Sequence, residues 1–293
     1  MTLITEIPGK PIVSEGIDTS GVVVPSIEEA EQWLSPPPAF ASTKPDGQRE
    51  IVAVGKAVYH SVVAKAYDSH LRMAAYTAWD VGANNLWFLP TRERLSYPFS
   101  ILYVISSLFK TEKLIGKKAD WFFWYDDDVI LPPNIVGELR RAADPQDRPF
   151  MAAVGYDRNP DFPAAVWELV DIPDGPKYYK QWIDMPESGI HKVQTTGLCA
   201  ALFHRSFFDR VPQPWFASVP PTVEADGYLN HRVNTDGWMC QRCYDSGVPL
   251  YVNCDVKIHH LGHRVEVGHD TAPSLRKIYK KGDASGTRPK GTD

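Results

Sequence analysis

Short apolar runs recur along the chain from residue 50 onward. Four of them are apolar throughout and only four or five residues long: Ile51–Val54, Leu86–Leu89, Trp121–Tyr125 and Phe150–Val154. Runs of that length without polar alternation are typical of strands buried on both faces of a parallel sheet. Leu250–Cys254 is of similar length and mostly apolar. We therefore expect these segments to be strands of one central sheet.

The stretches between these runs have helical periodicity. Residues 60–79 carry apolar side chains three or four positions apart, as on one face of an amphipathic helix, and residues 99–109 also favour a helix. Further helices are expected after Pro133 and over residues 238–244. Strands alternating with helices predict an α/β fold with a doubly wound nucleotide-binding half. The glycine motifs of dinucleotide-binding and P-loop proteins are not in the sequence.

Three consecutive carboxylates, Asp126–Asp128, directly follow the aromatic run Trp121–Tyr125. Open α/β sheets bind ligands at the carboxyl ends of their strands, where adjacent anions would repel one another without a counter-cation. Hard oxygen ligands suit Mg²⁺ or Mn²⁺. The sequence therefore predicts a divalent-metal site at this turn. The alternative is a polar turn that caps the next helix.

Composition places the chain among ordinary globular proteins. Of its 293 residues, 43% are hydrophobic and 23% are charged, which suits one large α/β domain or two smaller ones. The net charge of −5 disfavours a broad basic surface for nucleic acid. No apolar run approaches the roughly 18 residues of a membrane span, and the N-terminus lacks the features of a secretory signal. We expect a soluble, cytoplasmic protein without a membrane span.

Three parts of the chain differ in character. Residues 1–49 are interrupted by several prolines and carry one short helical pattern, so we expect an arm rather than a domain. Residues 50–270 hold the regular alternation and are expected to form the domain. Residues 271–293 are rich in Lys, Gly and Thr and are expected to be a basic, flexible tail.

The four cysteines all lie in the last third of the chain. Cys240 and Cys243 are spaced as in some zinc sites, and Cys254, His259, His260 and His263 follow them. His259 and His263 form a His-x₃-His pair after Cys243, a spacing that zinc sites use, but Cys240 and Cys243 are expected inside the helix over residues 238–244. We therefore expect ordinary buried cysteines, with structural zinc as the alternative.

Six segments occur in the order seen in one enzyme family. They are the strand and acidic turn at 124–128, Val154-Gly-Tyr-Asp-Arg-Asn-Pro-Asp-Phe-Pro163, the glycine-containing segment 196–205, Pro214-Trp-Phe216, the helix start 235–242 and His260-Leu-Gly262. Together they resemble the GT-A fold glycosyltransferases of the family 2-like group, of the bacterial and phage type. The resemblance covers roughly residues 50–265. It implies a GT-A fold with a mostly parallel sheet. It also implies a location in the cytoplasm of a bacterium or of a phage-infected host.

The resemblance also implies a donor and a metal. The donor would be a nucleotide-diphosphate sugar, above all a UDP-sugar, and the cofactor Mn²⁺ or Mg²⁺. Asp126, Asp128 and His260 would hold the metal, with His259 and His263 as competing histidines. The nucleotide would be bound by Asp126 and Asp127, together with Arg92 or Arg94; the family more often has Ala-Arg-Asn where this chain has Thr-Arg-Glu-Arg.

For the transfer step we expect Asp236 to be the general base of an inverting reaction, with Glu224 and Asp226 as alternatives. Thr235 stands where the family has an acidic residue, and Asp236 could instead only cap its helix. A retaining reaction would need no such base. The residues expected to bind the acceptor are Arg158, Gly197, Trp215 and Phe216.

Two other classes of protein remain open. A metal-dependent phosphoryl-transfer enzyme such as a nuclease also needs clustered carboxylates, but a second cluster and a basic groove are not evident. The other is a non-catalytic module that binds sugar or zinc. The acceptor could be a polysaccharide, a lipid, a protein or a hydroxymethylated DNA base. The basic stretch Arg276–Lys281 keeps DNA open despite the negative net charge.

Overall fold

The computed structural model describes residues 44, 46–58, 64–93, 95–156, 163–170, 178–218, 222–223, 229–230, 234–261 and 266–268. All of them belong to one compact unit, residues 40–293. The expected tail and nearly all of the expected arm lie outside the described residues. None of the helices in the described part is long and apolar enough to cross a membrane.

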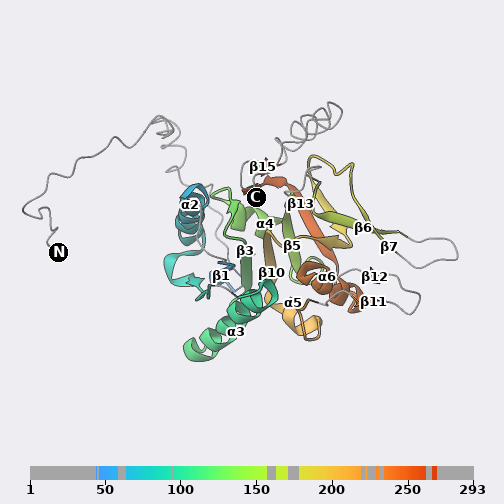
Figure 1. Ribbon diagram of the computed structural model, residues 1–293. Helices are drawn as coiled ribbons and strands as arrows, with labels where there is room; N and C mark the ends of the chain where they lie inside the picture. Colours follow the sequence, from blue (N-terminus) through green and yellow to red (C-terminus); the bar gives the residue numbers. More distant parts are fainter. Residues whose placement is uncertain are drawn as a thin grey trace, which may run out of the picture. The chain divides into compact units, whose positions relative to one another are not determined.

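A seven-stranded sheet forms the centre of the described part (Figure 1). In spatial order its strands are β2 (Leu86–Phe88), β1 (Val52–Lys56), β3 (Trp121–Tyr125), β10 (Ala200–His204), β5 (Phe150–Val154), β13 (Leu250–Lys257) and β8 (Ile190–Val193). β1 is parallel to β2 and β3, and β13 is parallel to β5. β10 runs antiparallel between β3 and β5, and β8 is antiparallel to β13. The expected α/β class with a mostly parallel sheet is confirmed.

Helices cover both faces of this sheet. They are α2 (Ala64–Val81), α3 (Tyr97–Ile115), α4 (Ile135–Ala142), α5 (Arg205–Arg210) and α6 (Thr235–Asp245), with a 3₁₀ turn at Ala83–Asn85. One apolar core joins the sheet to α3, α5 and α6, and a second joins it to α2 and α4. This layering is what an unbroken apolar strand requires, since neither face of β3 can remain in water.

The aromatic strand β3 shows how the sequence produces two cores. Side chains alternate across a strand, so Phe122 and Trp124 enter the core beneath α3. Trp121, Phe123 and Tyr125 enter the opposite core beneath α2 and α4. All five side chains are at least 96% buried. An alternating polar pattern at this place would have exposed one face of the sheet.

Three small sheets surround the central one. They are β14 (His259–Leu261) between β15 (Glu266–Gly268) and β4 (Val129–Ile130), β6 (Val166–Val170) between β7 (Tyr178–Gln181) and β9 (Thr195–Thr196), and the pair β11 (Thr222–Val223) and β12 (Leu229–Asn230). The pairing of β14 with β4 sets His260 opposite Val129. A residue late in the chain is thereby fixed beside the acidic turn.

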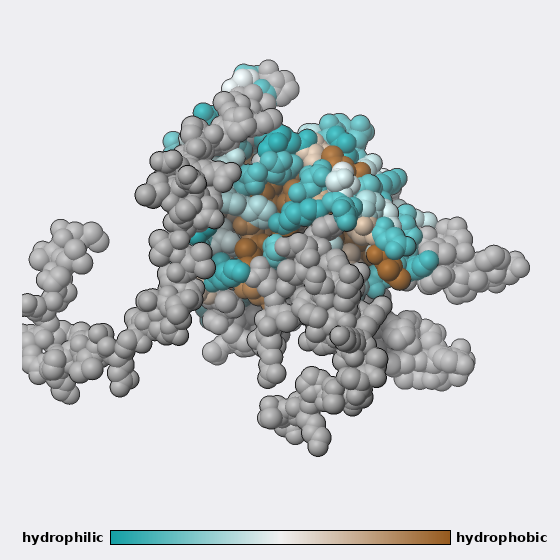
Figure 2. All heavy atoms as spheres, turned by 90° about the horizontal axis from the view of Figure 1, so that it is seen from above, coloured by the Kyte–Doolittle hydropathy of each residue, from teal (hydrophilic) through white to brown (hydrophobic). Residues whose placement is uncertain are grey.

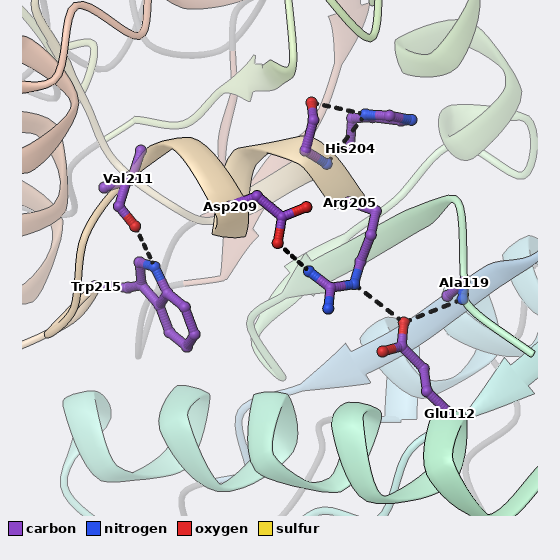
Figure 3. Close-up of polar contacts among 8 residues, drawn as sticks. Glu112, Ala119, His204, Arg205, Asp209, Val211 and Trp215 are labelled. Carbon is purple, nitrogen blue, oxygen red and sulfur yellow. Dashed lines mark hydrogen bonds and ion pairs between the residues drawn. The ribbon is translucent and has the colours of Figure 1, made fainter. Parts of the chain in front are cut away.

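A polar network fastens α3 and α5 to the start of β3 (Figure 3). Oε1 of Glu112 accepts hydrogen bonds from the Ala119 backbone N–H at 3.1 Å and from Nε of Arg205 at 3.2 Å. Arg205 also pairs with Asp209 at 3.3 Å. Because Glu112 is only 8% exposed, its charge needs these donors. These hydrogen bonds connect the C-terminal end of α3 to the segment before β3 and to the start of α5.

The outer surface agrees with this layered arrangement. On the face seen in Figure 2, hydrophilic residues cover most of the described surface, and hydrophobic residues are visible in narrower areas between them. Large exposed apolar side chains do occur. Four of them belong to α3: Phe99, Tyr103, Leu114 and Ile115.

Candidate functional site

A cleft of about 940 Å³ lies at the carboxyl end of β3. Its walls come from the acidic turn after β3, the first turns of α3 and α6, the segment 216–218 and β14. Its lining residues are Ala57, Ser96, Tyr97, Pro98, Phe99, Leu102, Asp126, Asp127, Asp128, Cys199, Phe216, Ala217, Ser218, Asn234, Thr235, Asp236 and His260. Four of them are carboxylates, and none of these described lining residues is Lys or Arg.

The three carboxylates of the acidic turn have different neighbours. The backbone N–H of Asp126 donates to the carbonyl of Cys199 at 3.0 Å, which anchors the turn to the segment before β10. Burial raises the pKa of Asp126 well above its usual range, and the charges of Asp128 and Asp236 raise it further, while a hydrogen bond with Tyr97 opposes the rise. Oδ1 of Asp126 is buried without a hydrogen-bond partner among the described residues.

Asp127 also lines the cleft, and it has a charged neighbour on β1. It interacts with Lys56, the last residue of β1, whose pKa is lowered by burial and raised in part by the charge of Asp127. Asp127 is 9% exposed. Lys56 therefore offsets part of the negative charge of the acidic turn.

His260 is the histidine that lines the cleft. Its Nδ1 lies 3.0 Å from the carbonyl oxygen of Tyr156, so a neutral ring has its proton there and turns an unprotonated Nε2 toward Asp128. Nε2 and Oδ1 of Asp128 are 3.2 Å apart. A backbone carbonyl that fixes the ring in this way is the usual support of a metal-binding histidine. His259 does not line the cleft, and His263 lies outside the described residues.

Asp236 occupies the first turn of α6 and is not its cap. Asn234 has that role, since its Oδ1 accepts from the Gly237 N–H at 2.8 Å. Oδ2 of Asp236 accepts from the Leu198 N–H at 3.3 Å, and Oδ1 is buried without a partner among the described residues. Burial raises the pKa of Asp236 from 3.8 to about 6. The capping alternative is therefore wrong for this residue.

Gly197 supports Asp236 by leaving room beside it. A Cβ atom at Gly197 would stand 3.1 Å from the Cβ of Ala165 and 3.8 Å from Oδ2 of Asp236. The Gly197 N–H donates to the Ala165 carbonyl at 2.7 Å. A side chain at this position would push β6 away from the base of the cleft or crowd the carboxylate.

Of the other predicted site residues, some line the cleft and others do not. Phe216 lines the cleft and is 1% exposed. Trp215 is 7% exposed; its ring packs on Phe109 and Phe208, and its Nε1 donates to the Val211 carbonyl (Figure 3). Trp215 lines a separate, adjoining cavity. Arg92 is exposed and is not among the lining residues. Arg94, Arg158, Glu224 and Asp226 lie outside the described residues.

Sequence reasoning missed Tyr97. Its ring packs edge-on against Trp124, whose Nε1 donates to the Tyr97 hydroxyl at 3.1 Å. The same hydroxyl is the hydrogen-bond partner of Asp126. The signal in the sequence was the helix start Ser96-Tyr-Pro98, which identifies the first turn but not its contact with the acidic turn.

The donor set fits a divalent metal shared with a ligand. The cleft gathers four carboxylates and an oriented imidazole, which are oxygen and nitrogen ligands suited to Mn²⁺ or Mg²⁺. In the described part, no three His, Cys, Asp or Glu side chains are grouped closely enough to form a metal site by themselves. Ligand oxygens or water would complete the coordination. For the zinc alternative, Cys240 and Cys243 are buried in α6, and among the described residues they are not grouped with further His, Cys, Asp or Glu ligands.

No family model and no curated protein matches the chain. Among solved structures, the crystal structure of A197 from STIV aligns with 14% identity and a TM-score of 0.46, over 75% of this chain and 91% of that one. A glycosyltransferase involved in glycosylation of the major capsid of PBCV-1 aligns with 12% identity and a TM-score of 0.29, over 56% and 69%. The synthetase for CMP:2-keto-3-deoxy-manno-octonic acid, complexed with CTP, aligns with 11% identity and a TM-score of 0.34, over 81% and 99%.

These similarities are too low to carry an argument about activity or substrate. The architecture itself is a mostly parallel seven-stranded sheet flanked by helices in the described residues. What the cleft does has to be argued from its residues.

Proposed function

We propose that this chain is a metal-dependent glycosyltransferase that moves a sugar from a nucleotide-diphosphate sugar to an acceptor hydroxyl. The observation that carries the proposal is the lining of the cleft. Four carboxylates and one histidine converge there, without Lys or Arg among the described lining residues. Such a cluster repels itself unless a cation joins it. The positive charge of a divalent cation bound between them would offset the negative charges of both the carboxylates and the diphosphate.

The chemistry needs a metal-binding group and an acid–base group among these side chains. When the bond between the sugar carbon and the phosphate oxygen breaks, its electron pair and negative charge remain on the diphosphate. A divalent metal bound there supplies Lewis-acid stabilisation of that charge. Asp126, Asp128 and His260 would hold the metal. The carbonyl of Tyr156 keeps the His260 ring oriented, and Tyr97 keeps Asp126 in place.

Asp236 suits the acceptor side of the cleft. In an inverting transfer the acceptor oxygen forms the new bond to the sugar carbon and gives up its proton. A carboxylate with a pKa of about 6 is ionised at neutral pH, yet it is more basic than an exposed aspartate and so takes up that proton more readily. Asp236 belongs to α6 and the acidic turn follows β3, so base and metal ligands are held by separate rigid elements.

The test is a screen of nucleotide sugars for release of the nucleotide diphosphate, with Mn²⁺, with Mg²⁺ and with chelator. The full-length protein should release nucleotide diphosphate from at least one donor only when metal is present. The Asp236→Asn variant, which keeps the metal ligands, should still bind donor and metal. Failure to bind any nucleotide diphosphate with metal would contradict the proposal. Metal-dependent cleavage of phosphodiesters instead would favour the phosphoryl-transfer alternative.

A further inference from the structure

Helix α3 has an apolar side facing solvent as well as one facing the core. Phe99 is 65% exposed, Tyr103 37% and Leu114 88%. At 100° per residue these three lie within about 60° of one another around the helix, opposite the side that packs on the sheet. Ile115, in the last turn, is 48% exposed. Large apolar side chains gathered on one exposed helix face mark a contact surface more often than scattered ones do.

The same face is basic at its C-terminal end. Two exposed lysines, Lys110 and Lys113, lie on this part of α3, and the exposed Lys117 and Lys118 follow just beyond the end of the helix. The structure describes all of α3, and its single acidic residue is Glu112, which is 8% exposed and paired with Arg205 (Figure 3). The solvent face of α3 therefore has lysines and no carboxylate, in a chain whose formal net charge is −5. This charge is complementary to an anionic surface.

The face is continuous with the cleft. Phe99 and Leu102 line the cleft. Leu102 also lines a second cavity of about 420 Å³ together with Phe109, Lys110 and Lys113. A mostly apolar depression thus follows α3 from the mouth of the cleft toward the lysines. Over the 19 residues of α3 this face is about 28 Å long, at a rise of 1.5 Å per residue.

We propose that the solvent face of α3 docks the protein on an anionic lipid bilayer. The helix lies parallel to the membrane, with Tyr103 and Leu114 at the boundary between headgroups and acyl chains and the lysines beside lipid phosphates and carboxylates. Helices that lie in a membrane interface combine such apolar side chains with Lys and Arg. A soluble polyanion such as a nucleic acid would satisfy the lysines but would leave Leu114 in water.

Docking in this way brings the mouth of the cleft to the membrane surface, because Phe99 belongs both to the docking face and to the cleft. The inference concerns a surface and not a reaction. It therefore stands or falls independently of the proposed transferase activity.

The experiment is co-sedimentation of the full-length protein with vesicles. One set contains phosphatidylcholine alone, and the other contains phosphatidylcholine with phosphatidylserine. We expect binding to the anionic vesicles that weakens as salt is added. Each lysine near an anionic surface strengthens binding about fivefold, so Lys110→Gln/Lys113→Gln should weaken it about 30-fold. Leu114→Gln should weaken it about tenfold.

The matched control is Ile183→Gln/Lys192→Gln, which removes one exposed apolar residue and one exposed lysine elsewhere. It should bind the vesicles like the unmodified protein. Insertion is tested separately with a polarity-sensitive dye on the Leu114→Cys variant. The four native cysteines are buried, so the dye should react selectively at position 114, and its emission should shift to the blue on anionic vesicles.

Equal binding to both kinds of vesicle, or an unchanged affinity of the Lys110→Gln/Lys113→Gln variant, would overturn the proposal. A dye that stays in water while the protein binds would do the same. So would tighter, lysine-dependent binding to heparin than to the vesicles, because it would identify a soluble polyanion as the partner.

Discussion

Replacing Asp236 by asparagine should make the protein more stable while it removes activity. Burial raises the pKa of this carboxyl from 3.8 to about 6, so the folded state binds its proton more tightly than the unfolded state does. The resulting stabilisation is full below pH 3.8 and is lost as the pH rises through about 6. At pH 7 the ionised carboxylate therefore destabilises the folded state relative to a neutral side chain. A neutral amide of the same shape removes this destabilisation.

The size of the effect follows from the pKa shift. A shift of about two units at 1.36 kcal/mol each corresponds to about 3 kcal/mol. This is an upper bound, because part of the residue is exposed on the floor of the cleft. For a domain of this size, 1 kcal/mol moves the melting temperature by roughly 2 to 4 °C. Asp236→Asn should thus raise the melting temperature at pH 7.5 by at most roughly 6 to 12 °C, and by much less at pH 4.

The assay is thermal unfolding of both proteins at several pH values, with sugar transfer measured in parallel. Asp245→Asn at the exposed end of α6 is the control and should change stability by less than about 0.5 kcal/mol. Loss of a general base should lower transfer by roughly two to four orders of magnitude. An Asp236→Asn variant that melts below the unmodified protein at pH 7.5, or a difference that does not shrink at pH 4, would refute the reasoning.

Two further predictions concern the surroundings of the cleft. Gly155→Ala should cost about 1 to 3 kcal/mol of stability in urea unfolding, because its Cβ would stand 2.6 Å from Sγ of Cys199. The double variant Gly155→Ala/Cys199→Ala should recover this loss. Gly137→Ala is the control and should show no loss, since its Cβ would stand 3.5 Å from Asp80. Burial lowers the pKa of His70 from 6.5 to about 4, so its contribution to stability is present above pH 6.5 and is lost as the pH falls toward 4. The free energy of unfolding of the unmodified protein should therefore fall by at most about 3 kcal/mol over this pH range because of His70. In His70→Gln this pH dependence should be absent, and an unchanged pH dependence would contradict the role given to His70.

The strands were the most predictable part of the fold. Trp121–Tyr125 and Phe150–Val154 have the predicted bounds, since an unbroken apolar run suits a strand buried on both faces, and the two runs end at Asp126 and Gly155. The helix predicted over 99–109 instead spans Tyr97–Ile115. Its last turns carry exposed lysines that interrupt the apolar pattern, and the helix continues until Gly116 adopts a left-handed conformation with φ 72°.

Strand direction was not predictable from the apolar pattern. Residues 198–203 form another apolar run, but such a run does not distinguish parallel from antiparallel pairing, and β10 runs antiparallel to both of its neighbours. The same limit applies to Trp215. Its aromatic type suits either a binding surface or a core, and the packing against Phe109 and Phe208 that places it in the core is tertiary.

The candidate site was predictable as residue types and not as contacts. Asp126, Asp128, Asp236 and His260 were named from local motifs, and the structure gathers them around one cleft. The roles of Tyr97 and Tyr156 depend on contacts across 29 and 104 positions of the chain, such as the Tyr156 carbonyl that orients His260. No local pattern encodes contacts of that kind.

The most direct test of the central claim is the ligand-induced stabilisation of Asp128→Asn. Unmodified protein and variant are melted with and without Mn²⁺ plus UDP, each ligand also being tested alone. At about a hundredfold excess over the dissociation constant, bound ligand should stabilise the unmodified protein by about 2.7 kcal/mol, and only when metal and nucleotide are both present. The variant loses the carboxylate that faces Nε2 of His260 at 3.2 Å. It should melt without ligand within a few degrees of the unmodified protein and gain almost nothing from the pair. A variant that keeps the full stabilisation, or an unmodified protein stabilised equally by UDP without metal, would contradict the metal site at this turn.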